Sequence, residues 1–162
     1  MIRPDKIISG GQTGVDQAGL DAAMALGIPH GGWCPRGRRS ENGPIPPCYN
    51  MKEMTTVEYP PRTRKNIEES DGTAVFTEGV FAAESGCALT VKICQKLEKP
   101  HLVIDLSRAS IQDAARFVRA FVRDRQIKIL NVAGSRASVS PALGIKVVQV
   151  LKLAFSEDEE NG

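Results

Sequence analysis

The sequence predicts an α/β protein in which helices cover both faces of a mainly parallel sheet. Two observations support this prediction. Short apolar runs rich in valine and isoleucine recur along the chain, and segments with the i, i+3, i+4 spacing of amphipathic helices separate them. Because strands that alternate with helices pair in parallel through right-handed crossovers, we expect a three-layer sandwich with a sheet of about five or more strands.

The first third of the chain opens with one strand and one helix. The β-branched run "KIIS" (Lys6–Ser9) predicts the strand, and a glycine turn leads into a helix from about Thr13 that ends before Gly27 at its C′ position. The segment 28–33 is a weaker strand candidate. The stretch 34–61 is rich in Pro, Gly and Arg and exceeds an ordinary connection, so it is functional, mobile, or hides short elements.

The remainder of the chain alternates regularly between helices and strands. Further strands are predicted at Gly72–Phe76, His101–Asp105 and Lys128–Gly134. Helices are predicted at 62–71, at 84–98, across 111–122 and across 147–155. We find no internal repeat and no linker, so the prediction is a single Rossmann-like ligand-binding domain, 1–155, followed by an acidic tail, 156–162.

Composition narrows the class of protein. The chain has 162 residues, of which 41% are hydrophobic and 25% charged, as in soluble globular domains. A net charge of +2 gives no reason to expect a nucleic-acid partner. No apolar run is long enough to span a bilayer and no secretory signal opens the chain, so we expect a cytoplasmic protein without a membrane partner. The four cysteines form no CxxC pair, which predicts reduced thiols and no metal bound directly by the protein.

In parallel sheets, ligands bind at the carboxyl ends of the strands, which directs attention to the loop after the first strand. Gly10, Gly11, Gln12, Thr13 and Gly14 precede the helix there, and Asp16 lies in its first turn. Glycines allow close approach of a ligand to backbone N–H groups, and a helix N-terminus attracts phosphate. The loop is neither a GxGxxG fingerprint nor a Walker loop. The alternative is a tight turn in which Thr13 caps the helix and Asp16 closes a capping box.

Three more loops at this edge carry hydrogen-bond donors. Arg36, Arg38 and Arg39 follow the second strand candidate, Thr77, Ser85 and Gly86 follow the third strand, and Asn131, Gly134, Ser135 and Arg136 belong to the last strand and its loop. Arg62 and Arg64 add further positive charge. Each loop also has a purely structural interpretation, as a solvated loop, a helix cap or a turn. Together they predict a pocket for a phosphorylated, heterocyclic ligand.

Four stretches of the sequence resemble a known family: "SGGQTGVDQAGLDAA", "GGWCPRGRRSENGPIP", "RTRKNIEESDGTAVF" and "LNVAGSRAS". They are similar to molybdenum carrier proteins, a family of the SLOG superfamily of Rossmann-like domains that also includes the Lonely-Guy phosphoribohydrolases. The resemblance implies binding of the molybdenum cofactor, molybdopterin, or a related nucleotide-like ligand. It implies that Gly10, Gly11, Thr13 and Gly14 contact phosphate. The other candidates for the site are Gln12, Asp16, Arg36, Arg39, Thr77, Ser85, Gly86 and Arg136.

The resemblance has one departure that bears on catalysis. Lonely-Guy enzymes carry a PGGxGTxxE loop, and the stretch "TEGVFAAESGCALT" lacks it. We therefore expect a non-catalytic binding protein, with a molybdenum-cofactor carrier as the specific candidate. One alternative is a nucleotide hydrolase in which Glu78 or Glu84 acts as acid or base. Another is a module that senses a nucleotide and signals to a partner.

A homodimer or higher homo-oligomer is also expected. In the helix 84–98, one apolar stripe comprises Leu89, Ile93 and Leu97, and a second comprises Cys87, Val91 and Cys94. A helix that covers a sheet needs only one stripe, so the other is predicted to meet a second copy. The alternative is that neighbouring helices cover it.

Overall fold

The computed structural model describes residues 2–156, so the predicted acidic tail lies outside the described residues except for Ser156. Five parallel strands form the central sheet in the order β2-β1-β9-β7-β8. The strands are β1 (Lys6–Ile8), β2 (His30–Gly31), β7 (Gly72–Thr77), β8 (His101–Asp105) and β9 (Ile129–Gly134). This arrangement confirms the predicted α/β class and its parallel sheet.

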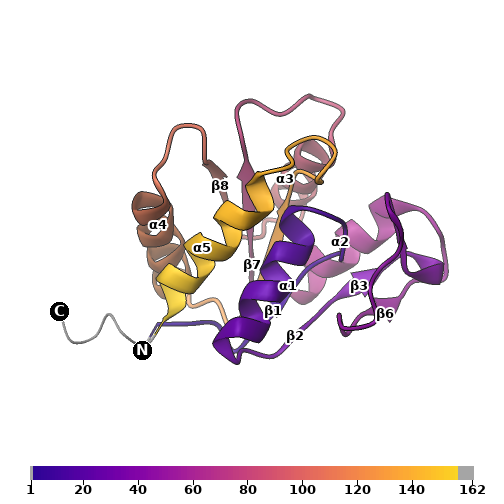
Figure 1. The fold of residues 1–162 in the computed structure, drawn as a ribbon, viewed down its shortest axis with the longest axis horizontal. Helices are drawn as coiled ribbons and strands as arrows, with labels where there is room; N and C mark the ends of the chain where they lie inside the picture. The colour runs from indigo at the N-terminus through magenta and orange to yellow at the C-terminus, as the bar shows by residue number, and fades with distance from the viewer. Residues whose placement is uncertain (1, 157–162) are drawn as a thin grey trace.

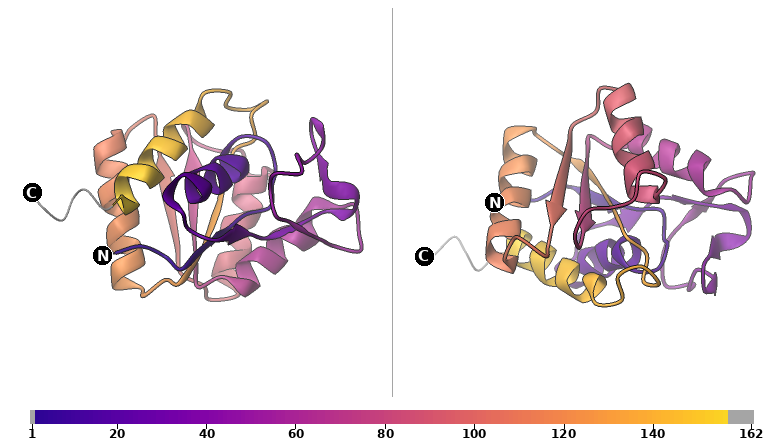
Figure 2. Two further views of the ribbon diagram at one scale, coloured as in Figure 1. Left: turned by 60° about the horizontal axis from the view of Figure 1, so that its bottom comes forward. Right: turned by 90° about the horizontal axis from the view of Figure 1, so that it is seen from above.

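Helices cover both faces of this sheet (Figure 1). On one face, α5 (Leu143–Phe155) packs between α1 (Val15–Leu26) and α4 (Ile111–Asp124). On the other face, α2 (Tyr59–Glu69) packs against α3 (Gly86–Lys96). Figure 2 shows the same three layers from two further sides. Every residue of β7 is buried, as expected for a central strand of a covered parallel sheet.

The last strand in the chain, β9, lies in the middle of the sheet between β1 and β7. If the chain is read from β9 onward, through β1, β2, β7 and β8, the strands occur in the order 3-2-1-4-5. That is the order of the common doubly wound sheet. The fold is therefore a doubly wound sheet whose first strand–helix unit, β9–α5, stands at the end of the chain.

The start of α1 and the weak strand differ from the sequence prediction. Helix α1 begins at Val15, two residues after Thr13, because the φ of 79° at Gly14 lies outside the range of a right-handed α-helix. Its end is as predicted, with Gly27 in the left-handed conformation. Of the segment 28–33, only His30–Gly31 pairs in the main sheet.

The long stretch 34–61 contains short elements that build a second small core. It holds a 3₁₀ turn at Arg36–Arg38, the hairpin of β4 (Arg39–Ser40) with β5 (Gly43–Pro44), and β6 (Lys52–Glu53), which pairs with β3 (Trp33–Cys34). Ile45 and Tyr49 of this stretch are buried together with Leu20 of α1. The stretch is thus packed against α1, to which the Tyr49 hydroxyl also donates a hydrogen bond at Asp21.

One of the two predicted apolar stripes of α3 packs within the chain. Ile93 and Cys94 are buried with Ile67 of α2, and Leu89 and Leu97 pack against them. Of the second stripe, Cys87 and Cys94 are buried and Val91 is half-buried, so a contact between copies at this helix stays a prediction. Within residues 2–156, no helix combines the length and apolar character needed to cross a membrane.

Candidate ligand-binding site

A cavity of about 660 Å³ opens at the carboxyl ends of β1, β7 and β9. This volume is within the usual range for small-molecule sites. The chain leaves β9 toward α5 on one face of the sheet and leaves β7 toward α3 on the other, so the cavity lies at the point where the winding reverses. Doubly wound sheets bind their ligands at this point. Polar side chains that line the cavity come from five segments and include Gln12, Asp16, Arg62, Asn66, Thr77, Thr90, Lys92, Asn131, Ser135 and Arg136.

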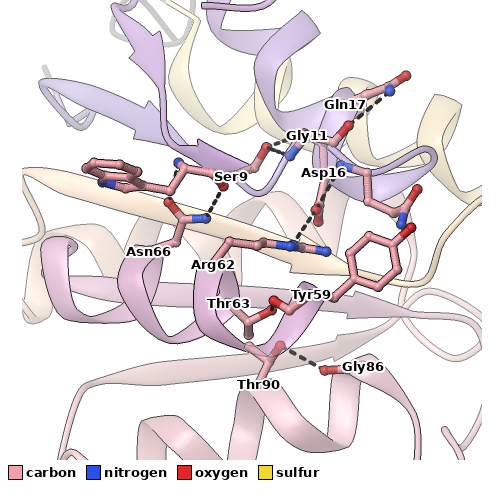
Figure 3. A network of polar contacts seen from close by, with 12 residues as sticks. Ser9, Gly11, Asp16, Gln17, Tyr59, Arg62, Thr63, Asn66, Gly86 and Thr90 are labelled. Carbon is pink, nitrogen blue, oxygen red and sulfur yellow. Dashed lines mark hydrogen bonds and ion pairs between the residues drawn. The ribbon is translucent and has the colours of Figure 1, made fainter. Parts of the chain in front are cut away.

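A buried ion pair forms part of the cavity wall (Figure 3). The Nη1 of Arg62, on α2, lies 3.2 Å from Oδ2 of Asp16, on α1, and their side chains are only 13% and 6% exposed. The same Asp16 oxygen accepts a hydrogen bond from the Gln12 N–H. Burial raises the pKa of the Asp16 carboxyl, and the Arg62 guanidinium opposes part of this rise. Asp16 thus holds Arg62 and the glycine loop in place.

The position of Arg62 accounts for the glycine at position 10, and the Nε of Arg62 has no hydrogen-bond partner within residues 2–156. A Cβ on Gly10 would lie 1.8 Å from Nη1 of Arg62, so the guanidinium occupies the space that any other residue would need. The Nε of Arg62 is buried and has no hydrogen-bond partner among the described residues. Buried donors in native proteins are almost always paired with protein, water or ligand. Because this Nε is closed to solvent, no ligand atom reaches it in this arrangement, and the unpaired donor is a cost of burying the ion pair.

The rest of the glycine loop lies behind the cavity wall. Gly14, with its φ of 79°, packs against the following loop: a Cβ there would lie 2.6 Å from the Ser135 carbonyl oxygen. The Val15 N–H donates to this same oxygen over 3.2 Å. The first turn of α1 is thus covered by the loop after β9. Of the predicted loop residues, Gly10, Gln12 and Asp16 line the cavity, whereas Gly11, Thr13 and Gly14 do not.

The first turn of α3 faces the cavity. Ser85 caps this helix, because its Oγ accepts the Ala88 N–H over 3.2 Å. Gly86, in the next position, has no atom within 4 Å of where a Cβ would be. Thr90, one turn further along, donates from Oγ1 to the Gly86 carbonyl. Ser85 and Gly86 line the cavity together with Thr77, as does Lys92 further along α3.

The loop after β9 is attached to a residue that the sequence analysis did not select. Glu41, in the hairpin turn of the 34–61 stretch, accepts hydrogen bonds from the Ser138 N–H, from the Ser138 hydroxyl and from the Thr13 hydroxyl. Its Oε2 lies 3.7 Å from Nε of Arg136. The hydrogen bonds from Ser138 and Thr13 lower the pKa of Glu41. Glu41 therefore fixes the loop that carries Arg136 to the edge of the cavity.

The arginines of the 34–61 stretch mostly support its own structure. Arg38 donates to the carbonyl oxygens of Ile45, Pro46 and Tyr49. Arg39 donates to the Val57 carbonyl and lies 4.6 Å from the centre of the Tyr59 ring, itself part of the cavity wall. Neither Arg36 nor Arg39 is among the residues that line the cavity.

The predicted acid–base candidates do reach the cavity. Glu78 and Glu84 both belong to its lining, and Oε2 of Glu78 lies 3.5 Å from Nζ of Lys146. Asp16, Glu78 and Glu84 therefore contribute three carboxylates, against the three cations Arg62, Lys92 and Arg136. Within residues 2–156, no group of three or more His, Cys, Asp or Glu side chains could hold a metal ion.

Fold and cavity position together define a Rossmann-like α/β domain of the doubly wound type. Residues 7–155 match the family described as the circularly permutated YpsA SLOG family, and the chain belongs to this family. The description agrees with the sheet, in which β9–α5 is the displaced first unit. It also confirms the resemblance to SLOG domains that the sequence indicates.

A solved structure supports the same assignment. The crystal structure of "Putative molybdenum carrier protein" from Syntrophus aciditrophicus SB superimposes on this chain with a TM-score of 0.91. The two sequences are 42% identical, and the match covers 94% of this chain and 96% of that one. No curated protein matches the chain.

Proposed function

We propose that the protein binds a phosphorylated heterocyclic molecule, of the size and chemistry of a nucleotide or of molybdopterin, in the cavity between α2 and α3. The single observation that carries this proposal is the cavity of about 660 Å³ at the reversal point of the sheet, whose lining includes the cations Arg62, Lys92 and Arg136. Guanidinium and ammonium groups donate strong hydrogen bonds to phosphate oxygens.

The phosphate is expected at the first turn of α3. Helix N-termini attract anions through their free N–H groups and their dipole. The first turn of α1 is covered by the Ser135 carbonyl, whereas Gly86 at the start of α3 has open space in front of it. Lys92 of α3 and Arg136 of the opposite loop add positive charge to the same cavity.

The heterocycle is expected against the apolar part of the wall. Val80 and Phe81 from the loop before α3, and Val139 from the loop after β9, line the cavity. Val80 is 97% exposed and Val139 is 64% exposed, so both have apolar surface to offer a flat ring. A ligand with a charged end and a flat apolar end therefore suits this cavity better than a simple anion does.

We further propose that the bound molecule is carried and not converted. The similar protein of known structure is named a molybdenum carrier, which supports molybdopterin as the first ligand to test. Molybdopterin has the required pterin ring and phosphate. Asp16 is engaged by Arg62 and by the Gln12 N–H, so its carboxylate is part of the cavity wall's own structure, and Glu78 lies near Lys146.

Native mass spectrometry of protein purified without refolding tests this proposal. We expect an added mass that dissociates as a single small molecule, with molybdenum by elemental analysis if the ligand is the complete cofactor. Failure to bind molybdopterin and a panel of nucleoside monophosphates in calorimetry would contradict the proposal. Release of free base from any of those nucleotides at about 1 per second or faster would instead support the hydrolase alternative, with Glu84 as the first residue to test.

A further inference from the structure

The strand β8 forms an open edge of the central sheet. It pairs with β7 on one side and stands last in the strand order of the described residues. Figure 2 shows it at the margin of the sheet. Val103, at the centre of β8, is 41% exposed, whereas every residue of the neighbouring β7 is buried. An exposed edge of this kind is a template for pairing with another strand.

The register with β7 tells which backbone groups of β8 face outward. The Thr73 N–H donates to the Pro100 carbonyl, and the Leu106 N–H donates to the Thr77 carbonyl. Because bonding alternates along a parallel strand, the even-numbered residues of β8 direct their backbone groups toward β7. The N–H and C=O groups of His101 and Val103 therefore point away from the sheet.

We propose that β8 pairs in antiparallel fashion with β8 of a second copy of this chain, about a two-fold axis at Val103. A two-fold interface requires a surface that complements itself. Centred on Val103, this pairing sets Val103 opposite its own copy and His101 opposite Asp105 of the second copy. Side chains of alternate residues lie on the same face, so each imidazole comes next to a carboxylate and the two valines come next to each other.

The surface beside this edge has the same self-complementary character. Phe117 of α4, 52% exposed, lines a hollow of about 450 Å³ together with Leu102, Val103 and Ile104. Arg108 and Asp113 belong to the same hollow and bring both signs of charge to it. Apolar surface flanked by charges of both signs suits a copy related by two-fold symmetry, because Arg108, 86% exposed and 3.9 Å from Asp105 of its own chain, can meet an anion of the other copy.

The proposed interface also adjoins the cavity. Oδ1 of Asp105 accepts the Gly79 N–H over 2.8 Å, and Gly79 belongs to the cavity wall. Pairing of β8 would therefore fix the position of Asp105, which accepts the hydrogen bond from Gly79 of that wall. The dimer itself does not depend on the proposed ligand, so it is tested without one.

Light scattering at micromolar concentration gives the first test. We expect twice the 17.5 kDa of the single chain, and a return to 17.5 kDa for Val103→Lys, which places a charge at the two-fold axis. Val103 is partly exposed, so the long lysine side chain can reach solvent in the monomer and the fold should persist. The matched control is Ile145→Lys on α5, 69% exposed and outside this hollow, which should stay dimeric. A mass of 17.5 kDa for the unmodified protein overturns the proposal.

Disulfide trapping tests the register independently. Cys48 is the exposed cysteine and the other three are buried, so Val103→Cys is made in a Cys48→Ser background. Directly opposed residues in a hydrogen-bonded antiparallel pair have Cα atoms about 5.5 Å apart, which a disulfide can span. We expect a covalent dimer on mild oxidation, and none for Val80→Cys, which is more exposed but lies in the cavity wall. A dimer that neither cross-links at position 103 nor responds to Val103→Lys would show that the contact lies elsewhere.

Discussion

At the scale of single residues, the ion pair of Asp16 and Arg62 dominates the energetics of the site. Both side chains are almost fully buried, and each neutralises the other in surroundings that cannot solvate an isolated charge. Removing one partner is therefore far more costly than removing both. The pair also determines which residue can occupy position 10, so its effect extends from stability to the shape of the cavity.

Arg62→Met should destabilise the protein by about 3–5 kcal/mol at neutral pH, because it leaves the Asp16 carboxylate buried without a partner. Burial already raises the pKa of Asp16, and loss of the guanidinium raises it further. A carboxyl whose pKa is higher in the folded than in the unfolded state stabilises the fold at low pH and loses this effect as pH rises. The loss measured by urea unfolding should therefore be larger at pH 7 than near pH 4.

The double variant Asp16→Asn, Arg62→Met serves as the control for this prediction. It removes both charges, so it should recover part of the lost free energy of unfolding and show little additional dependence on pH. Equal losses for the single variant at both pH values would contradict the assigned role of Asp16.

Glu41 links three loops through hydrogen bonds that need its charged form. These bonds lower its pKa, so its contribution to stability is present above the ordinary pKa of a glutamate and is lost as pH falls through the lower, folded-state value. We expect Glu41→Gln to lower the free energy of unfolding by about 1–3 kcal/mol at pH 7, and by less at pH 3. Glu98→Gln, at an exposed position, is the matched control. A difference that does not narrow toward pH 3 would contradict this assignment.

At the scale of elements, α1 and α3 both begin at the carboxyl edge of the sheet, but only the start of α3 is open to a ligand. The start of α1 is covered by the loop after β9, whereas the start of α3 is open toward the cavity. Substitution of Gly11 is consequently a poor test of ligand binding. A side chain there meets Ile45 at 2.8 Å and needs a φ of 75°, so loss of binding would report a disturbed fold.

Gly86→Asp is the cleaner substitution. The new side chain has open space, and an acidic residue in the first turn of a helix is stabilising, so the melting temperature should be unchanged or slightly higher. The carboxylate would repel a phosphate at the same place, and we expect the affinity for the identified ligand to fall by about tenfold or more, or 1.4 kcal/mol. Calorimetry measures this.

Gln112→Asp is its matched control, since it adds the same charge to the first turn of α4, away from the cavity. This variant should bind as the unmodified protein does. Unchanged affinity in Gly86→Asp would mean that the phosphate does not lie at the start of α3.

At the scale of the whole molecule, the position of β9 shows that the fold tolerates its units in a different chain order. Figures 1 and 2 show the beginning of the described chain and the end of α5 on the same side of the molecule. The connection between α4 and β9 runs over the exposed residues Arg125 and Gln126. A chain opened there and joined through its tail would have its strands in the usual doubly wound order.

We expect this rearranged chain, starting at residue 126 and with residue 162 joined to residue 1 by a short Gly-Ser linker, to fold. Its circular dichroism spectrum should be unchanged, and its melting temperature about 5 °C lower, corresponding to a loss of about 1–2 kcal/mol. A matched chain opened inside β7, for example between Val75 and Phe76, should not fold, because both residues are fully buried. Failure of the first chain to fold would show that the β9–α5 unit depends on its place in the sequence.

Much of the secondary structure was accessible to sequence reasoning because its signals are local. The alternation of apolar strands with amphipathic helices, the glycine at the end of α1 and the run Ala74–Phe76 in β7 each depend on neighbours within a few residues. The rule that ligands bind at the carboxyl edge selected four loops, of which three line the cavity, through Gly10, Gln12, Asp16, Thr77, Ser85, Gly86 and Arg136. The loop of Arg36 and Arg39 does not, because those arginines are used within the 34–61 stretch or lie outside the cavity. Gly11, Thr13 and Gly14 were also predicted to contact the ligand but do not line the cavity. The sequence does not show that the loop after β9 packs against Gly14.

The sequence by itself determined the class of fold, the order of most elements and the edge of the sheet where the cavity lies. Only the tertiary structure decided that β9 enters the middle of the sheet, that Arg62 pairs with Asp16, and that Glu41 holds the loop of Arg136. The physical reason is the separation of the partners along the chain, 46 residues for Asp16 and Arg62 and 97 for Glu41 and Ser138. Periodicity and propensity act over a few residues, whereas these contacts exist only once helices and strands have packed.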